Sequence, residues 1–139
     1  MIRAPLGIAL GVIACVLAGA RGTSMADDRA RPAFTGPQAD TGRLLYVQHC
    51  ASCHMPNLSG SNDAPELAGS NFRSAWKTRT TTDLLDYISG AMPPGGATLD
   101  AKAYASIVAH ILQSNGAAAG PQPLTHATRL VIGTLTPLH

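Results

Sequence analysis

The chain has 139 residues, with ten Lys or Arg and eight Asp or Glu, a size that suits one small domain with terminal extensions. Removing residues 1–26 takes away two of the basic residues and none of the acidic ones, so the remaining charges balance. Because no stretch of the sequence is persistently basic, we expect no nucleic-acid partner.

The first part of the chain has the pattern of an export signal. Arg3 supplies a positive charge, an apolar stretch rich in small residues runs to Ala20, and a small-x-Ala cleavage site ends at Ala26. Cleavage after Ala20 is a close alternative. These features predict an exported protein in the periplasm of a bacterium. The apolar stretch is short for a bilayer span. Membrane association is therefore expected only if the segment is retained or if Cys15, which loosely fits a lipoprotein box, is lipidated.

The first helix of the domain is expected to begin at a cap formed by Asp40 or Thr41 and to run to about Cys50. Gly42, Tyr46 and Cys50 are spaced by four residues, so they share one face of this helix. A glycine early in a helix lowers its stability, and we therefore expect Gly42 to allow a close crossing with another helix.

The middle of the chain is expected to hold a long ordered loop and two helical segments. Prolines and glycines punctuate residues 55–69, which favours an irregular loop. A short helical turn is expected over residues 72–77. Thr81 or Thr82 can then cap a helix that stops at the proline-rich segment beginning with Met92.

The last helix has the strongest periodic pattern in the chain. It is expected over about residues 100–114, with Asp100 as its N-cap and Asn115-Gly116 at its end. Its apolar side chains recur at the i, i+3, i+4, i+7 and i+8 positions of an amphipathic helix: Tyr104, Ile107, Val108, Ile111 and Leu112.

These elements divide the chain into four parts. Residues 1–26 form the export signal, residues 27–37 an irregular leader, and residues 38–116 a single domain. Residues 117–139 are interpreted as a linker followed by a tail, in which residues 130–134 resemble a short strand without a visible partner.

The decisive pattern is Cys50-Ala51-Ser52-Cys53-His54. Two thiols three positions apart at a helix end can reach the vinyl groups on one edge of a haem, and the histidine that follows places an imidazole beneath the iron. A redox dithiol, half of a zinc site and a simple disulfide remain as alternatives. A redox dithiol is typical of a βαβ unit, and a zinc site needs another Cys or His pair; the sequence has neither. A disulfide would not need His54. We therefore predict one haem c attached at Cys50 and Cys53, with His54 as an iron ligand.

With this motif the chain resembles the class I c-type cytochromes, and it is similar to the small monohaem domains associated with quinoprotein dehydrogenases. The resemblance covers about residues 38–115. It includes, besides the cysteine-histidine motif, an ordered set of residues: Gly42, Tyr46, Pro65-x-Leu67-x-Gly69, Met92-Pro93-Pro94 and Tyr104. It implies an all-α, cytochrome c-like fold, in which three main helices and long loops wrap around one covalently bound haem. It also implies that the first and last helices cross through Gly42, Tyr46 and Tyr104.

The resemblance assigns the second axial position of the iron to Met92. Two prolines follow Met92 and keep the chain extended, so its thioether can reach the far face of the haem. The alternative is an ordinary packing methionine at a helix end. Met55 lies beside His54 and is badly placed for that face. Three histidines remain as other ligand candidates, although each is more typical of a helix surface or a tail: His49, His110 and His126.

Further residues are expected around the haem. Four apolar side chains should line its pocket: Leu67, Leu84, Ile88 and Ile111. The resemblance also places Pro65 near the proximal histidine. Trp76 either donates its indole N–H to a haem propionate or packs in the core. Three cations either pair with the propionates or form a solvated face: Arg73, Lys77 and Arg79.

The expected function is one-electron transfer in the periplasm without substrate chemistry, because His and Met ligation leave no open coordination site. The expected partners are redox proteins, such as a quinoprotein dehydrogenase or a terminal oxidase. A second hypothesis makes the chain the cytochrome domain or subunit of a quinohaemoprotein dehydrogenase, because a linker followed by strand-like sequence resembles the join to a dehydrogenase propeller. A third is a gas- or peroxide-binding haem protein with an open site.

Overall fold

The computed structural model describes residues 31–95 and 98–136. In these residues the chain forms six helices, and its β-type pairing is limited to an isolated bridge between Thr80 and Val131. The fold is all-α, as the sequence predicts. The predicted export signal and Cys15 lie outside the described residues. No helix within the described ranges has the length and apolar character needed to cross a bilayer.

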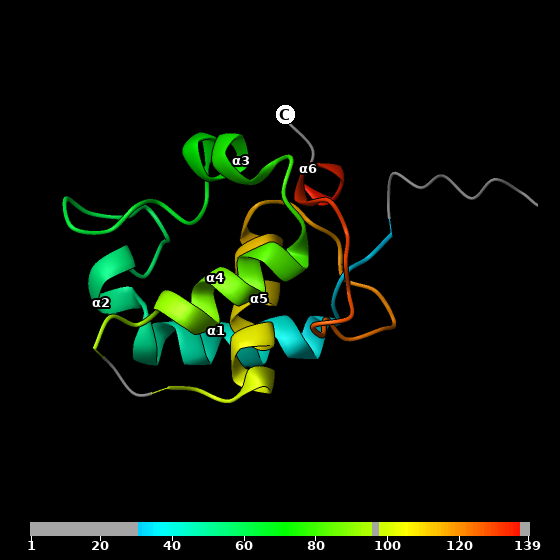
Figure 1. Ribbon diagram of the computed structural model, residues 1–139, viewed down its shortest axis with the longest axis horizontal. Coiled ribbons are helices and arrows are strands. Elements are labelled where there is room, and N and C mark those ends of the chain that lie inside the picture. The colour runs from blue at the N-terminus through cyan, green and yellow to red at the C-terminus, as the bar shows by residue number, and fades with distance from the viewer. Residues whose placement is uncertain (1–30, 96–97, 137–139) are drawn as a thin grey trace, which may run out of the picture.

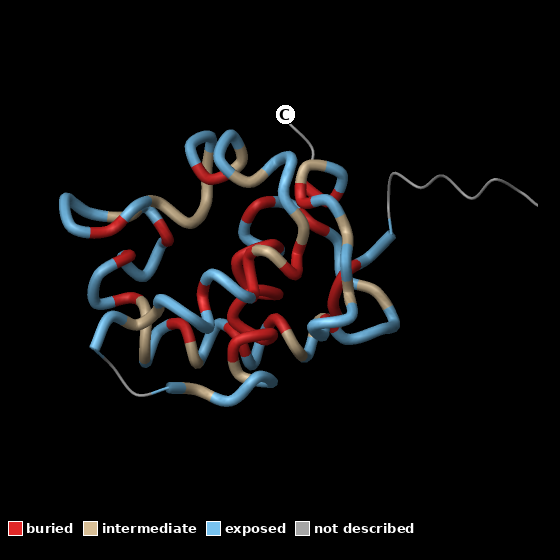
Figure 2. Tube along the Cα trace, viewed as in Figure 1, coloured by how far each residue is buried: buried red, intermediate tan, exposed pale blue. Residues whose placement is uncertain are grey.

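Three helices form the body of the domain (Figure 1). α1 (Gly36–His49) and α5 (Ala101–Ser114) cross closely, and α4 (Thr81–Ala91) packs against α5. Two short helices, α2 (Ala51–His54) and α3 (Ser70–Trp76), are joined by a long loop at one side of this body. Buried positions are concentrated along α5 (Figure 2), so this helix is the centre of the core.

α1 and α5 cross at a glycine. A Cβ atom on Gly42 would lie 1.7 Å from the carbonyl oxygen of Ser106 and 2.4 Å from its carbonyl carbon, so only glycine allows this approach of the two backbones. One turn later Tyr46 is fully buried, and its ring centroid lies 5.4 Å from that of His110. The close crossing predicted from Gly42 is confirmed, and the aromatic contact beside it joins Tyr46 to His110.

α1 begins at Gly36, so the expected start at Asp40 or Thr41 is wrong. The side chain of Thr35 caps the helix by accepting a hydrogen bond from the backbone N–H three residues on, at 3.3 Å. Pro37 lies in the first turn, where backbone N–H groups have no acceptor within the helix, so a residue without an N–H is tolerated there. The proline that suggested an irregular leader therefore belongs to the start of the helix.

α4 also begins earlier than expected. Thr80 is its N-cap and forms a reciprocal capping box with Asp83: each side chain accepts a hydrogen bond from the backbone N–H of the other residue. Thr81 and Thr82, the caps expected from the sequence, are buried instead. The Thr81 hydroxyl donates to the Thr128 carbonyl, and the Thr82 hydroxyl donates to the His126 carbonyl at 3.2 Å, both in the C-terminal part of the chain.

The ends of α5 follow the prediction. The Asp100 side chain accepts a hydrogen bond from the N–H of Ala103 at 2.7 Å and so caps the first turn. At the other end Asn115 terminates the helix, and Gly116 follows with a φ of 90°, a left-handed value that glycine adopts without steric cost.

The strand expected over residues 130–134 is wrong. Val131 contributes only the bridge to Thr80, and the chain then turns into α6 (Ile132–Leu135). The Ile132 side chain is fully buried, and its N–H donates to the carbonyl of Arg79 at 2.9 Å. A short apolar run is compatible with either element, and here its contacts with the α3–α4 connection decide between them.

Residues 117–136 pack back against the domain (Figure 1). The side-chain amide of Gln38 on α1 donates to the Leu124 carbonyl at 2.8 Å, and its oxygen accepts from the Leu124 N–H at 2.7 Å. The N–H of Gly120 donates to the carbonyl of Phe34 at 2.7 Å. Because Phe34 and Leu124 are both buried, the stretch interpreted as a leader and the one interpreted as a linker both contribute to the core.

Candidate functional site

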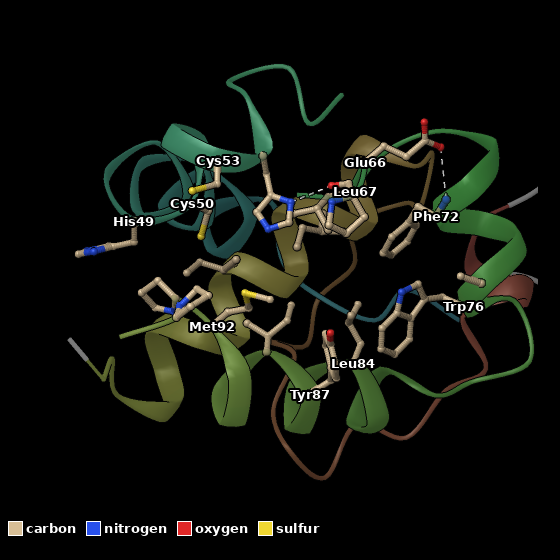
Figure 3. Close-up of a pocket in the computed structure, with 18 of the residues that line it drawn as sticks. His49, Cys50, Cys53, Glu66, Leu67, Phe72, Trp76, Leu84, Tyr87 and Met92 are labelled. Carbon is tan, nitrogen blue, oxygen red and sulfur yellow. Dashed lines mark hydrogen bonds between the residues drawn. The ribbon is translucent and has the colours of Figure 1, made fainter. Parts of the chain in front are cut away.

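A cavity of about 670 Å³ opens between α2, α3, α4 and the loop that joins α2 to α3. Its volume lies within the ~300–1,000 Å³ that cofactor pockets usually have. Figure 3 shows its walls, with the two cysteines at one end and Trp76 at the other. All ten residues expected to surround or bind a haem line it: Cys50, Cys53, His54, Pro65, Leu67, Trp76, Leu84, Ile88, Met92 and Ile111.

The two cysteines are presented by a break between helices. α1 ends at His49, and Cys50 leaves helical geometry with a φ of −122° before the single turn of α2 begins. Cys53 is exposed and Cys50 half-buried, and both are free thiols. This break turns the second cysteine and the histidine after it toward the same cavity as Cys50.

The structure gives no support to a redox dithiol or to a zinc site as alternatives to haem attachment. Burial raises the pKa of the Cys50 thiol to about 11, so this group stays protonated at neutral pH, whereas a redox dithiol needs an accessible thiolate. No cluster of three or more His, Cys, Asp or Glu side chains is arranged to hold a metal ion within residues 31–95 and 98–136.

His54 is buried and oriented by a single hydrogen bond. Its Nδ1 lies 2.8 Å from the carbonyl oxygen of Pro65, and because a carbonyl can only accept, Nδ1 must carry the proton. In the neutral imidazole Nε2 then carries no hydrogen, and its lone pair is the one that binds metals. The expectation that Pro65 lies near His54 therefore has a chemical basis in this geometry, since its carbonyl selects the tautomer.

Asn115 holds the loop that contains Pro65, a role that the sequence did not indicate. Its side-chain N–H groups donate to the carbonyls of Leu67 and Ile111, both at 2.9 Å, and its side-chain oxygen accepts from the N–H of Gly69 at 3.1 Å. Asn115 is itself buried. A polar side chain buried with all its groups satisfied restrains its neighbours strongly, so α5 fixes the loop that orients His54.

Met92 ends α4 and points into the cavity (Figure 3). Its backbone is extended, with φ −128° and ψ 142°, and its N–H donates to the Ile88 carbonyl at 2.9 Å. The Tyr104 hydroxyl donates to the Met92 carbonyl at 2.9 Å, so the hydroxyl of Tyr104 contacts the end of α4. Met55, by contrast, is 36 % exposed and does not line the cavity.

Aromatic side chains form the end of the cavity opposite the cysteines. Trp76 packs between Phe72 and Tyr87, with centroid separations of 6.2 and 5.7 Å, and the Arg79 guanidinium lies 4.9 Å from the Trp76 ring centroid. Arg79 also lines the cavity. Trp76 and Arg79 therefore both bring N–H groups to this end of the cavity, where acidic substituents of a ligand can accept hydrogen bonds.

Arg73 and Lys77, the other two cations considered for this role, face elsewhere. They line a separate pocket of about 280 Å³ beside Val131 and Gly133. The two cations are spaced by four and so share one side of the helical segment, whereas Trp76 belongs to the side that faces the larger cavity. Of the two alternatives for Arg73 and Lys77, this placement gives no support to pairing with the propionates.

The three other histidines differ in position. His49 is half-buried and lines the rim of the cavity beside Cys50. His110, expected on a helix surface, is buried at the crossing with α1, and burial and then the nearby Arg43 lower its pKa. His126 lies outside the cavity and pairs with Asp86 at 2.8 Å.

These residues fit a haem. The cavity has mainly apolar walls, two thiols at one end, an imidazole with a free Nε2 and a thioether from α4, which together supply the attachment and ligand atoms that a haem c needs. A family model described as cytochrome C oxidase, cbb3-type, subunit III matches residues 37–111. The chain belongs to this family of c-type cytochromes. Membership implies haem c and electron transfer rather than catalysis.

The cytochrome is also similar to a solved structure. The crystal structure of the sulfane dehydrogenase SoxCD from Paracoccus pantotrophus contains a chain that is 26% identical, with a TM-score of 0.56. The similarity covers 87% of this cytochrome and 68% of that chain. A comparison with curated proteins found no match. The resemblance to class I c-type cytochromes is thus confirmed by the family match and by the similarity to a known structure.

Proposed function

We propose that this cytochrome is a periplasmic one-electron carrier with a single haem c, attached through Cys50 and Cys53 and bound axially by His54 and Met92. The observation that carries the proposal is the convergence of these four side chains on one cavity of suitable volume. Bound there, the haem supplies reversible Fe(III)/Fe(II) cycling. The export pattern of residues 1–26 is the basis for the periplasmic location.

The chain contributes the orientation and electrostatics of this site. The Pro65 carbonyl accepts a hydrogen bond from the Nδ1–H of His54, which leaves Nε2 free to bind iron and makes it a stronger ligand. Met92 supplies a thioether from the other wall, and His/Met ligation favours a high potential while leaving no position for a substrate. Apolar residues such as Leu84 and Ile88 keep water away from the site.

The exposed cysteine end suits contact with redox partners. Cys53 is exposed while His54 is 7 % exposed, so the attachment edge of the haem would reach the surface while the iron stays enclosed. We propose partners of two kinds. The family description points to a terminal oxidase, and the similarity to SoxCD points to a dehydrogenase.

A second candidate function is the cytochrome domain or subunit of a dehydrogenase, which the similarity to SoxCD supports. A linker followed by a strand no longer supports this candidate, because residues 117–136 pack onto the cytochrome itself. Gentle purification from the source cells distinguishes the two: a stoichiometric complex with a dehydrogenase favours the subunit, and a free cytochrome favours the diffusible carrier.

The first test is production of the full chain in a host that matures c-type cytochromes. We expect a periplasmic protein whose mass exceeds that of the polypeptide by one haem, and Cys50→Ala or Cys53→Ala should prevent normal covalent attachment. A colourless protein with the mass of the bare polypeptide would contradict haem attachment, and retention in the cytoplasm would contradict the location.

The second test concerns the axial ligand. Met92→Ala should leave the haem attached, lower the reduction potential and remove the long-wavelength absorption band of a thioether bound to ferric iron. Met55→Ala is the matched control, because Met55 lies next to His54 but outside the cavity, and it should change neither property. Identical spectra and potentials for Met92→Ala and the unsubstituted protein would refute the assignment. Rapid binding of carbon monoxide by the unsubstituted reduced protein would favour the open-site hypothesis instead.

A further inference from the structure

We propose that Tyr104 is a positioning residue that keeps the thioether of Met92 at the haem iron. Its hydroxyl fixes both ends of the loop between α4 and α5, at Met92 and at Leu99. The inference rests on the proposed function, since it requires Met92 to be an axial ligand.

The hydroxyl of Tyr104 makes two hydrogen bonds of opposite sense. It donates to the Met92 carbonyl at 2.9 Å and accepts from the N–H of Leu99 at 3.3 Å. A phenol offers one donor and can accept as well, so both roles are met by one group. The Tyr104 side chain is 3 % exposed, and its removal would leave the Met92 carbonyl without this partner.

The described residues of the loop between these two points make few other hydrogen bonds to the domain. Pro93 and Pro94 have no N–H, and a side chain at Gly95 would meet no atom within 4 Å. In the described part of the loop, residues 93–95 and 98–99, the bond from Leu99 to Tyr104 is the hydrogen bond that attaches the backbone to the domain. The position of Met92 therefore depends on its own two backbone groups.

The N–H and the carbonyl of Met92 form hydrogen bonds to different helices. Its N–H bonds to Ile88 in α4, and its carbonyl bonds to Tyr104 in α5. α5 is locked to α1 at Gly42 and also carries Ile107 and Ile111 on the cavity wall. Movement of the chain after α4 away from the cavity would withdraw the thioether from the iron. The Tyr104 hydroxyl opposes this movement because it ties that chain to the core.

The test measures how often Met92 leaves the iron. Imidazole binds ferric haem only when the thioether has dissociated, so its apparent affinity is proportional to the dissociated fraction. In holoprotein, Tyr104→Phe should strengthen imidazole binding about two- to tenfold, the factor that corresponds to loss of the neutral hydrogen bond to the Met92 carbonyl. The thioether band should remain in the absence of imidazole, because Met92 is still the preferred ligand.

A double-mutant cycle separates positioning from a general change in the pocket. Tyr104→Phe should have no effect on imidazole binding when Met92→Ala is already present, since no thioether remains to be displaced. Tyr46→Phe is the chemically matched control: it also removes a buried phenol, which donates to the Met55 carbonyl at 2.7 Å. It should lower stability without strengthening imidazole binding.

Three results would overturn the proposal: unchanged imidazole affinity in Tyr104→Phe, an equal effect in the Met92→Ala background, or an equal effect of Tyr46→Phe. If Tyr104→Phe yields no holoprotein, amide hydrogen exchange at Leu99 in the unsubstituted protein decides, because the amide should be protected and exchange at the rate of an open peptide would refute its bond. Failure of the axial assignment is distinguishable, since the unsubstituted protein would then lack the thioether band.

Discussion

The close crossing of α1 and α5 makes Gly42→Ala the sharpest test of the fold. The added Cβ would lie 1.7 Å from the Ser106 carbonyl oxygen, while real Cβ atoms essentially never come within 3.0 Å of such an atom. The helices must therefore separate by at least the difference, 1.3 Å. The obstructing atoms belong to the backbone of α5, which cannot rotate away as a side chain can.

The expected loss of stability follows from two opposing contributions. Overpacking a core costs typically ~1–3 kcal/mol, and obstruction by backbone places this site at the upper end. Replacing glycine by alanine within a helix stabilises the helix by about 1 kcal/mol through its higher helix propensity. We expect Gly42→Ala to lower the free energy of unfolding of the holoprotein by about 2 kcal/mol. Because Ile107 and Ile111 would move with α5, the haem absorption should also change.

Urea unfolding followed by circular dichroism and by haem absorbance measures this loss. Gly90→Ala is the control, since Gly90 lies in the exposed part of α4 and an added Cβ would meet nothing within 4 Å. It should be neutral or stabilising, by up to about 1 kcal/mol. Equal unfolding midpoints for Gly42→Ala and the unsubstituted protein would show that the helices do not approach as described.

Two further predictions concern buried polar side chains in α5 and at its C-terminal end. Asn115→Ala should lower the free energy of unfolding by about 2–3 kcal/mol, because it leaves buried partners at Leu67, Gly69 and Ile111 unsatisfied; urea unfolding that detects no loss would show that water replaces the side chain. His110 has a folded-state pKa below its unfolded value of about 6.5, so the unfolded state takes up a proton first and stability falls as pH drops from about 6.5 toward the folded pKa. His110→Phe should reduce this slope between about pH 7 and 5, and an unchanged slope would place the titrating group elsewhere.

The chemistry-bearing residues could be recognised from the sequence because they are local. Cys50, Cys53 and His54 occupy adjacent turns of the chain, so their spacing alone determines that they face one ligand. Met92 was singled out by resemblance to the Met-Pro-Pro segment of the family, and the two prolines that follow it indicate an extended segment at a helix end. The tertiary structure then brings this methionine and the cysteine motif to one cavity.

Helix starts were predicted less well than helix ends. Thr80 and Thr81 are chemically equivalent in the sequence, and the choice between them depends on whether Asp83 can reach back to the cap. Thr81 is occupied instead by a hydrogen bond to the Thr128 carbonyl, far along the chain. Local helix propensity does not depend on a partner so distant along the chain, so the sequence does not specify the start of α4.

The sequence by itself determined the haem motif, the three main helices and the close contact at Gly42, because each depends on spacing within a few turns. The family resemblance placed Pro65 near His54, but only the tertiary structure decided that its carbonyl bonds to Nδ1. Only the tertiary structure likewise decided that Tyr104 bonds to Met92, and that the residues after 117 bond to α1 and to the α3–α4 connection. Hydrogen bonds of this kind join residues that are distant along the chain and require atoms to meet within about 3 Å. Hydrophobic periodicity specifies which face of a helix is buried, but the register at which two faces meet is set by the packing of the whole core.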